Sequence, residues 1–154
     1  MEVFRLTTTK YSKTLTASGK EARWNYDNEF VLYCGASRSL STLELCVRKN
    51  TIQTALQYEI MVLSISDNEE MITKVQKKDL PKNWRETTTT PVELRKIGSE
   101  WYTNKKSLVL QVPSIIVPQE YNYLININHQ DFKDENVKLV RNEEYFWDDR
   151  LIVP

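Results

Sequence analysis

Short apolar segments of strand character outnumber helical segments in this sequence, and the two kinds do not alternate regularly along the chain. Residues 56–65 carry apolar side chains at both odd and even positions, which is typical of a central strand covered on both faces. This order predicts an α+β fold with largely antiparallel sheets, because regular alternation would be needed for a parallel one. The predicted strands are 3–6, 30–34, 56–65, 108–112, 123–127 and 145–147.

Two segments space their apolar residues as an amphipathic helix does. The first, residues 39–47, begins with Ser39, a residue type favoured at the N-cap. The second follows Thr-Pro-Val-Glu at residues 90–93, which has the form of a capping box with proline at the first helical position. We expect this second helix to weaken at Gly98. Its predicted apolar face consists of Val92, Leu94, Ile97 and Trp101.

The composition is that of one globular domain, which we place over residues 1–154. With 40% hydrophobic and 27% charged residues, the chain can bury a core without disulfides or metals. Its 21 basic and 21 acidic residues balance, so it lacks the basic footprint of a nucleic-acid-binding protein. No apolar segment approaches the length of a membrane span, and Cys34 and Cys46 have the apolar surroundings of free buried thiols. We therefore expect a cytoplasmic protein.

Glycine is scarce in this chain, and that limits its chemistry. Three glycines cannot supply the clustered glycines of a Rossmann or Walker loop. Any bound nucleotide must therefore have its phosphates held by side chains. A metal site is not expected, because Cys34, Cys46 and His129 lack the close spacing of zinc ligands.

Pro113-Ser114 interrupts an apolar segment that would otherwise continue through residues 115–117. Proline lacks the N–H of a sheet ladder, so the break marks either a strand that leaves its sheet or a rigid turn that holds Ser114 in a site. A hydrolase pair of Ser114 and His129 also stays open. The chain has no nucleophile elbow, however, and the neighbours of His129 favour a turn or capping role.

Arg23, Tyr33 and Glu44 form the main candidate constellation. Each has an ordinary structural explanation: a surface arginine, an aromatic residue packed in a strand, and a helical glutamate that faces water. Glu44 fits its explanation least well, because leucines flank it on both sides. Spacing alone leaves the structural and the functional interpretation open.

Short motifs follow one another in a recognisable order along nearly the whole chain. They are Phe4-Arg5, Ala22-Arg23-Trp24-Asn25, Leu32-Tyr33, Ser39-Leu40, Leu43-Glu44, Leu80-Pro81-Lys82-Asn83-Trp84, Ile97-Gly98-Ser99-Glu100-Trp101, Val112-Pro113-Ser114, Glu120-Tyr121-Asn122-Tyr123-Leu124-Ile125-Asn126, His129-Gln130-Asp131-Phe132 and Asp148-Asp149-Arg150. This order resembles the RES domain, a bacterial toxin family named for its arginine, glutamate and serine. Two positions depart from the family pattern: Ala22 stands where glycine is expected, and Ile127 stands where a proline usually follows Asn126.

The resemblance implies an ADP-ribosyltransferase-like fold with a split β core flanked by helices. It also implies a toxin that cleaves the nicotinamide–ribose bond of NAD by hydrolysis or phosphorolysis, with no metal and no cofactor beyond this substrate. In that chemistry a glutamate stabilises oxocarbenium-like charge, an arginine binds pyrophosphate, a tyrosine stacks on nicotinamide, and a serine bonds the ribose or the carboxylate. The implied catalytic residues are Arg23, Tyr33, Glu44 and Ser114, and the implied NAD-binding residues are Arg23, Tyr33, Ser114 and Asn25.

A partner follows from the same resemblance. The family implies a Xre-type helix-turn-helix antitoxin that neutralises the toxin, and it allows a toxin dimer within that complex. Two other functions stay open: transfer of ADP-ribose onto a protein target, and a non-catalytic binding module. The balanced charge disfavours direct action on nucleic acid, and no membrane partner is expected.

Overall fold

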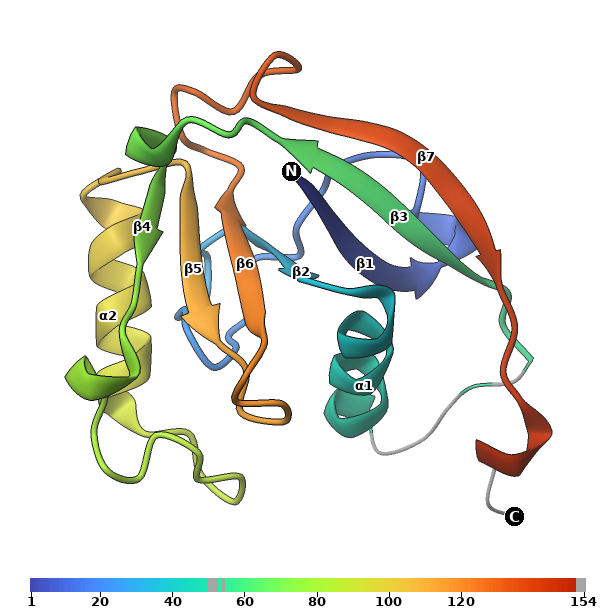
Figure 1. Ribbon diagram of the computed structural model, residues 1–154, viewed down its shortest axis with the longest axis horizontal. Coiled ribbons are helices and arrows are strands. Elements are labelled where there is room, and N and C mark those ends of the chain that lie inside the picture. Colours follow the sequence, from blue (N-terminus) through green and yellow to red (C-terminus); the bar gives the residue numbers. More distant parts are fainter. Residues whose placement is uncertain (50–52, 54, 152–154) are drawn as a thin grey trace.

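The computed structural model describes residues 1–49, 53 and 55–151. Its centre is a seven-stranded sheet in the order β4-β5-β6-β2-β1-β3-β7, in which β4 and β5 run parallel and the other neighbouring strands run antiparallel (Figure 1). The predicted α+β class with a largely antiparallel sheet is confirmed. The strands are β1 (Glu2–Thr8), β2 (Val31–Gly35), β3 (Tyr58–Ile65), β4 (Ile72–Lys74), β5 (Val109–Pro113), β6 (Tyr121–Asn126) and β7 (Val137–Tyr145). The helices are α1 (Arg38–Lys49), α2 (Val92–Thr103) and the short 3₁₀ segments η1 (Thr9–Tyr11), η2 (Glu69–Met71), η3 (Lys77–Asp79) and η4 (Asp149–Leu151).

The sheet is split into two halves between β1 and β2. In the described chain these two strands share only the pair Phe4–Gly35, whereas β1 pairs with β3 along its whole length. α1 packs against β1 and β2 at this split, and α2 lies against the half that contains β4 and β5 (Figure 1). Leu94 and Trp101 of α2 join buried residues of β5 and β6 in one apolar cluster. Each half therefore has its own helix, and the helix that carries Glu44 lies at the split.

α1 begins with a serine cap, although not the predicted one. The backbone N–H of Leu40 donates to Ser37 Oγ over 3.1 Å, and Ser37 Oγ donates to Glu120 Oε2 over 2.8 Å. Ser39 lies inside the helix, because the helix starts at Arg38, so Ser39 as the N-cap is wrong. The contact with Glu120, just before β6, anchors the start of α1 to the strand that contributes Asn122.

A second anchor joins the first residue of α1 to β7. Arg38 Nε and Nη2 donate to the two carboxylate oxygens of Glu143, each over 2.7 Å, and the guanidinium lies 4.4 Å from the ring centre of Phe4. The bond from Arg38, assisted by Arg141, lowers the pKa of Glu143 from 4.5 to about 2. Because the folded pKa lies below the ordinary value, this pair stabilises the fold above about pH 4.5 and loses its contribution as the pH falls toward 2.

We therefore expect Glu143→Gln to lower the melting temperature at pH 7 and to have a smaller effect at pH 3. The side chains are partly exposed, so the difference should be modest and should shrink further in high salt. Thermal unfolding of both proteins across this pH range measures it. A difference that grows on acidification would contradict the role of the ion pair.

Gly98 brings α2 against the segment that carries Arg23. A Cβ at this position would lie 1.8 Å from the carbonyl oxygen of Trp24 and 2.7 Å from its carbonyl carbon. Such contacts require the helix and the backbone around Arg23 to separate. The glycine does not end the helix, which continues to Thr103; it permits the close approach.

Gly98→Ala should therefore destabilise the protein, although alanine in a helix normally gains about 1 kcal/mol over glycine. Overpacking against a backbone typically costs about 1–3 kcal/mol. Chemical denaturation of this variant and of Lys96→Ala, an exposed position on the same helix, provides the comparison. A Gly98→Ala protein as stable as Lys96→Ala would show that the segment can shift freely.

Two predicted elements differ from the structure. The capping box at residues 90–93 is wrong: Pro91 occupies the N-cap, no side chain caps α2, and Val92 is exposed rather than part of the apolar face. The strand predicted at residues 145–147 lies earlier, at Val137–Tyr145. This edge strand pairs only with β3 in the described sheet, so its polar and charged residues obscure an apolar pattern.

Candidate active site

Glu44 projects from the middle of α1 and is held by side chains from two other segments. Ser114 Oγ donates to Glu44 Oε1 over 3.0 Å, and Asn122 Nδ2 donates to the same oxygen over 2.5 Å. Among the residues that the structure describes, none donates to Oε2. The carboxylate is therefore fixed through one oxygen while its second oxygen stays available.

Ser114 lies directly after β5, where Pro113 ends the strand. The serine is fully buried, and its hydroxyl accepts the backbone N–H groups of Ile116 over 3.1 Å and Val117 over 3.2 Å. The same hydroxyl donates to Glu44. The break at Pro113-Ser114 thus closes a turn, as serine often does, and also presents a donor to the carboxylate.

Ser114→Ala should consequently lower stability and turnover together. Loss of the turn bonds should cost about 1 kcal/mol, and loss of the donor should leave Glu44 less firmly held. Melting temperature and turnover, measured on one purified sample, test both roles. A destabilised variant with full turnover would assign Ser114 to architecture alone.

Tyr33 lies on β2, and its hydroxyl is fixed by the loop that precedes this strand. The hydroxyl donates to Asn25 Oδ1 over 2.7 Å and accepts the backbone N–H of Trp24 over 3.3 Å. Asn25 is buried, and its Nδ2 donates to backbone carbonyl groups, including that of Tyr26 over 2.8 Å. These contacts make Asn25 the residue that orients Tyr33. Its contact with NAD stays a prediction.

Arg23 is half-buried in the same loop. Nη1 donates to the carbonyl oxygens of Glu86 over 3.0 Å and Trp84 over 3.5 Å, while Nε and Nη2 donate to none of the residues described in the structure. Burial lowers the pKa of Arg23, and the negative charge of Glu44 is the largest influence that opposes this. The two groups thus act on one another by charge, without an ion pair within 4.0 Å in the described chain. The loop, α1 and the end of β5 place a cation, a carboxylate and a hydroxyl in one region.

Comparison with known proteins identifies a family for this chain. The family model described as "RES domain" matches residues 2–148. This chain belongs to the RES domain family. A "Toxin Res" from Yersinia enterocolitica is 34% identical to the present RES domain over 137 residues, which cover 86% of this chain and 88% of that protein. A "Prs ADP-ribosylating toxin" from Sphingobium is 31% identical over 131 residues, with 84% and 80% covered. A "Toxin Res" from Photorhabdus laumondii is 28% identical over 156 residues, with 99% and 97% covered.

The RES domain also matches a solved structure, the crystal structure of the M. tuberculosis MbcT–MbcA toxin–antitoxin complex. The TM-score is 0.73, and the match covers 94% of this chain and 84% of that one at 12% sequence identity. At this identity the likeness concerns the fold alone. The split sheet flanked by two helices is therefore the expected ADP-ribosyltransferase-like fold.

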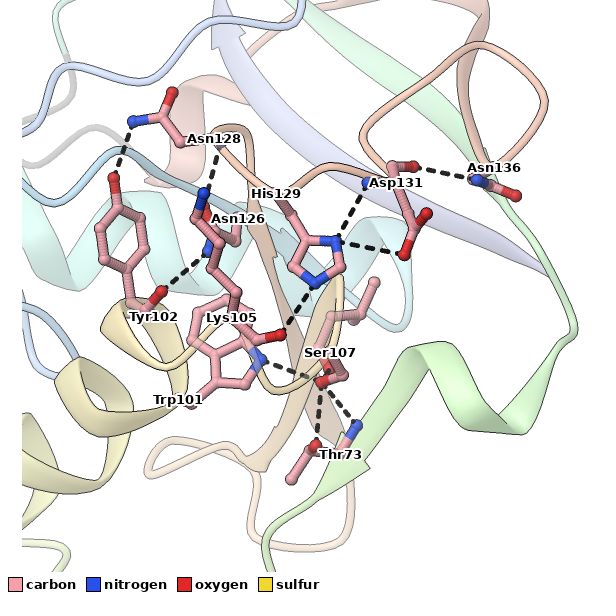
Figure 2. Close-up of polar contacts among 11 residues, drawn as sticks. Thr73, Trp101, Tyr102, Lys105, Ser107, Asn126, Asn128, His129, Asp131 and Asn136 are labelled. Carbon is pink, nitrogen blue, oxygen red and sulfur yellow. Dashed lines mark hydrogen bonds and ion pairs between the residues drawn. The ribbon is translucent and has the colours of Figure 1, made fainter.

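His129 lies far from Ser114 in this RES domain, so the hydrolase pair is wrong. Lys105 precedes β5 and Ser114 follows it, which puts roughly 15 Å of strand between the two ends. Figure 2 shows the His129 ring beside Lys105 and Asp131: Nε2 lies 3.1 Å from the Lys105 carbonyl oxygen, and Nδ1 accepts the Asp131 backbone N–H over 3.1 Å. The ring therefore carries its proton on Nε2. It links the loops that contain Lys105 and Asp131, in agreement with the turn role that the residues around His129 favour.

Neither cysteine of the RES domain takes part in the site. Both are free thiols, and burial raises the pKa of Cys34 to about 12.

In the described residues no group of three or more His, Cys, Asp or Glu could hold a metal ion. None of the helices described there is long and apolar enough to span a membrane. Two surface cavities, of about 230 and 450 Å³, lie beside His129 and beside Tyr58, away from Glu44. The candidate site is defined here by the side chains around Glu44.

Asn122 is the site residue that the sequence did not assign. It lies in the motif of residues 120–126 that supports the RES resemblance, which names no role for it. A polar residue at the start of an apolar strand, close to Ser114 across the hairpin, is the signal that could have identified it. The register pairs Asn122 with Val112, two residues before Ser114.

Proposed function

We propose that this RES domain is a bacterial toxin that cleaves the nicotinamide–ribose bond of NAD, with water or phosphate as the acceptor. The observation that carries the proposal is the Glu44 carboxylate, held through one oxygen and acting by charge on a half-buried Arg23. The names of two relatives as Res toxins and of a third as an ADP-ribosylating toxin support it.

In the proposed step, the side chains of the site stabilise the positive charge that develops on the ribose. As the bond to nicotinamide breaks, its electron pair leaves with the ring, and positive charge develops on the anomeric carbon and ring oxygen. Glu44 Oε2, which receives no hydrogen bond from the described residues, is the carboxylate oxygen available to stabilise that charge. Nε and Nη2 of Arg23, which donate to none of the described residues, match a pair of pyrophosphate oxygens, and the Tyr33 ring would stack on nicotinamide.

The direct test is to incubate the purified protein with labelled NAD, with and without phosphate. Free nicotinamide should form together with ADP-ribose, or with ADP-ribose 1″-phosphate where phosphate is the acceptor. A protein that leaves NAD unchanged under both conditions would contradict the proposal.

Transfer of ADP-ribose onto a protein target is the second candidate, supported by the relative named an ADP-ribosylating toxin. The same side chains would serve, and only the acceptor would differ. Labelled NAD distinguishes the two activities. Label that accumulates on protein, with little free nicotinamide in the absence of that protein, would favour transfer.

We further propose a Xre-type antitoxin as a cytoplasmic partner that covers the region of Arg23 and Glu44, in a complex that can contain a toxin dimer. Support comes from the related fold in a toxin–antitoxin complex. Co-expression should restore growth and suppress NAD loss. A partner that binds tightly and leaves NAD turnover unchanged would contradict this mode of neutralisation.

A further inference from the structure

Asn122 contacts Glu44 more closely than Ser114 does, yet the proposed reaction gives it no part. It is the second residue of β6, where it pairs with Val112 of β5 on one side and Gly35 of β2 on the other. A residue paired on both sides has little freedom to move. Ser114, by contrast, reaches Glu44 from a turn.

The orientation of the Asn122 amide is determined by Glu44. Nδ2 donates to Glu44 Oε1 over 2.5 Å, whereas the reversed amide would place two acceptor oxygens against each other. In the preferred orientation Asn122 Oδ1 is buried and has no hydrogen-bond partner in the described structure. A buried acceptor without a partner costs stability, and such groups call for an explanation.

We infer that Asn122 is a positioning residue for the cleavage, an inference that rests on the proposed function. Its amide holds Oε1 from a rigid strand, so that Oε2 keeps one direction relative to the ribose. Without this bond Ser114 is the one described residue that holds the carboxylate, which can then rotate about its terminal side-chain bond. On this interpretation the amide is present for its bond to Glu44, and the unpartnered Oδ1 is the destabilising consequence.

Asn122→Leu provides the sharpest test, because leucine keeps a similar size and removes the unpartnered oxygen. We expect turnover (kcat) to fall by about tenfold to a hundredfold, as for a lost hydrogen bond to a charged group, with KM nearly unchanged. The melting temperature should stay at the wild-type value or rise. The matched control is Asn126→Leu on the same strand, since Asn126 donates to the Tyr102 carbonyl and not to Glu44. That variant should lose stability and keep kcat in the folded fraction.

A double-mutant cycle with Glu44→Gln then shows whether Asn122 acts through Glu44. Asn122→Leu should cause little further loss of kcat in the Glu44→Gln background. The same loss in both backgrounds, or a wild-type kcat for Asn122→Leu alone, would overturn the inference. Failure of the proposed function is distinguishable, because the wild-type protein would then leave NAD intact. In that case the same variants are compared by growth arrest on expression, where Asn122→Leu should weaken toxicity and Asn126→Leu should not; equal toxicity would overturn the positioning role.

Discussion

Glu44→Gln should reduce NAD turnover by about 10²–10³-fold while leaving the fold intact, because the amide cannot stabilise positive charge on the ribose. Glutamine is nearly isosteric with glutamate and can still accept the bonds from Ser114 and Asn122 through its carbonyl oxygen. The melting temperature should therefore change little. The loss should appear in kcat rather than KM, since the charge is needed chiefly in the transition state.

The matched control for this variant is Glu100→Gln, which makes the same chemical change at an exposed position of α2. That variant should keep wild-type turnover and toxicity. If folded Glu44→Gln protein consumed NAD at the wild-type rate, the carboxylate would have no role in the cleavage. A large fall in the melting temperature would instead assign Glu44 to the structure around the split in the sheet.

The fold could be predicted from the sequence where apolar residues alone determine the element. The strands predicted at residues 30–34 and 108–112 and the helix predicted at 39–47 correspond, within one or two residues, to β2, β5 and α1. β7 could not be located correctly, because an edge strand faces solvent and carries charged residues. The three-residue β4 could not be predicted either, because it is too short for any period and depends on its pairing with β5.

Some residues of the candidate site could likewise be selected from the sequence, and others are evident only in the structure. Residue types and family motifs were enough to select Arg23, Tyr33, Glu44 and Ser114, and the structure shows a direct bond between Ser114 and Glu44. Their catalytic roles stay predictions. Asn122 was not assigned, because the family resemblance gave it no role and its bond to Glu44, across 78 positions, is visible only in the structure. Nor could the sequence show that Gly98 is needed for packing against Trp24, since a close approach leaves no local pattern.

Arg23→Lys should lower kcat/KM for NAD by about tenfold to a hundredfold, mainly through KM, because lysine cannot reproduce a bidentate contact with pyrophosphate. In the structure Nη1 of Arg23 donates to the Glu86 and Trp84 carbonyl oxygens, while Nε and Nη2 donate to none of the described residues. A single ammonium group cannot both donate to these carbonyl oxygens and make a bidentate contact with the pyrophosphate. The lysine variant is therefore expected to bind NAD less tightly and to fix the loop around Trp84 less well.

The pH dependence adds a second signature to the Arg23→Lys prediction. Burial lowers the pKa of Arg23, and the like charge of Arg95 acts in the same direction. A lysine at the same place starts from a lower ordinary pKa of about 10.4 and shifts readily when buried. Its positive charge, and with it NAD affinity, should decline toward alkaline pH, whereas the wild-type arginine should keep its charge. The control is Arg150→Lys, because the Arg150 side chain is 90% exposed and pairs with Asp148. Equal KM values for Arg23→Lys and Arg150→Lys across the pH range would show that Arg23 does not contact the pyrophosphate.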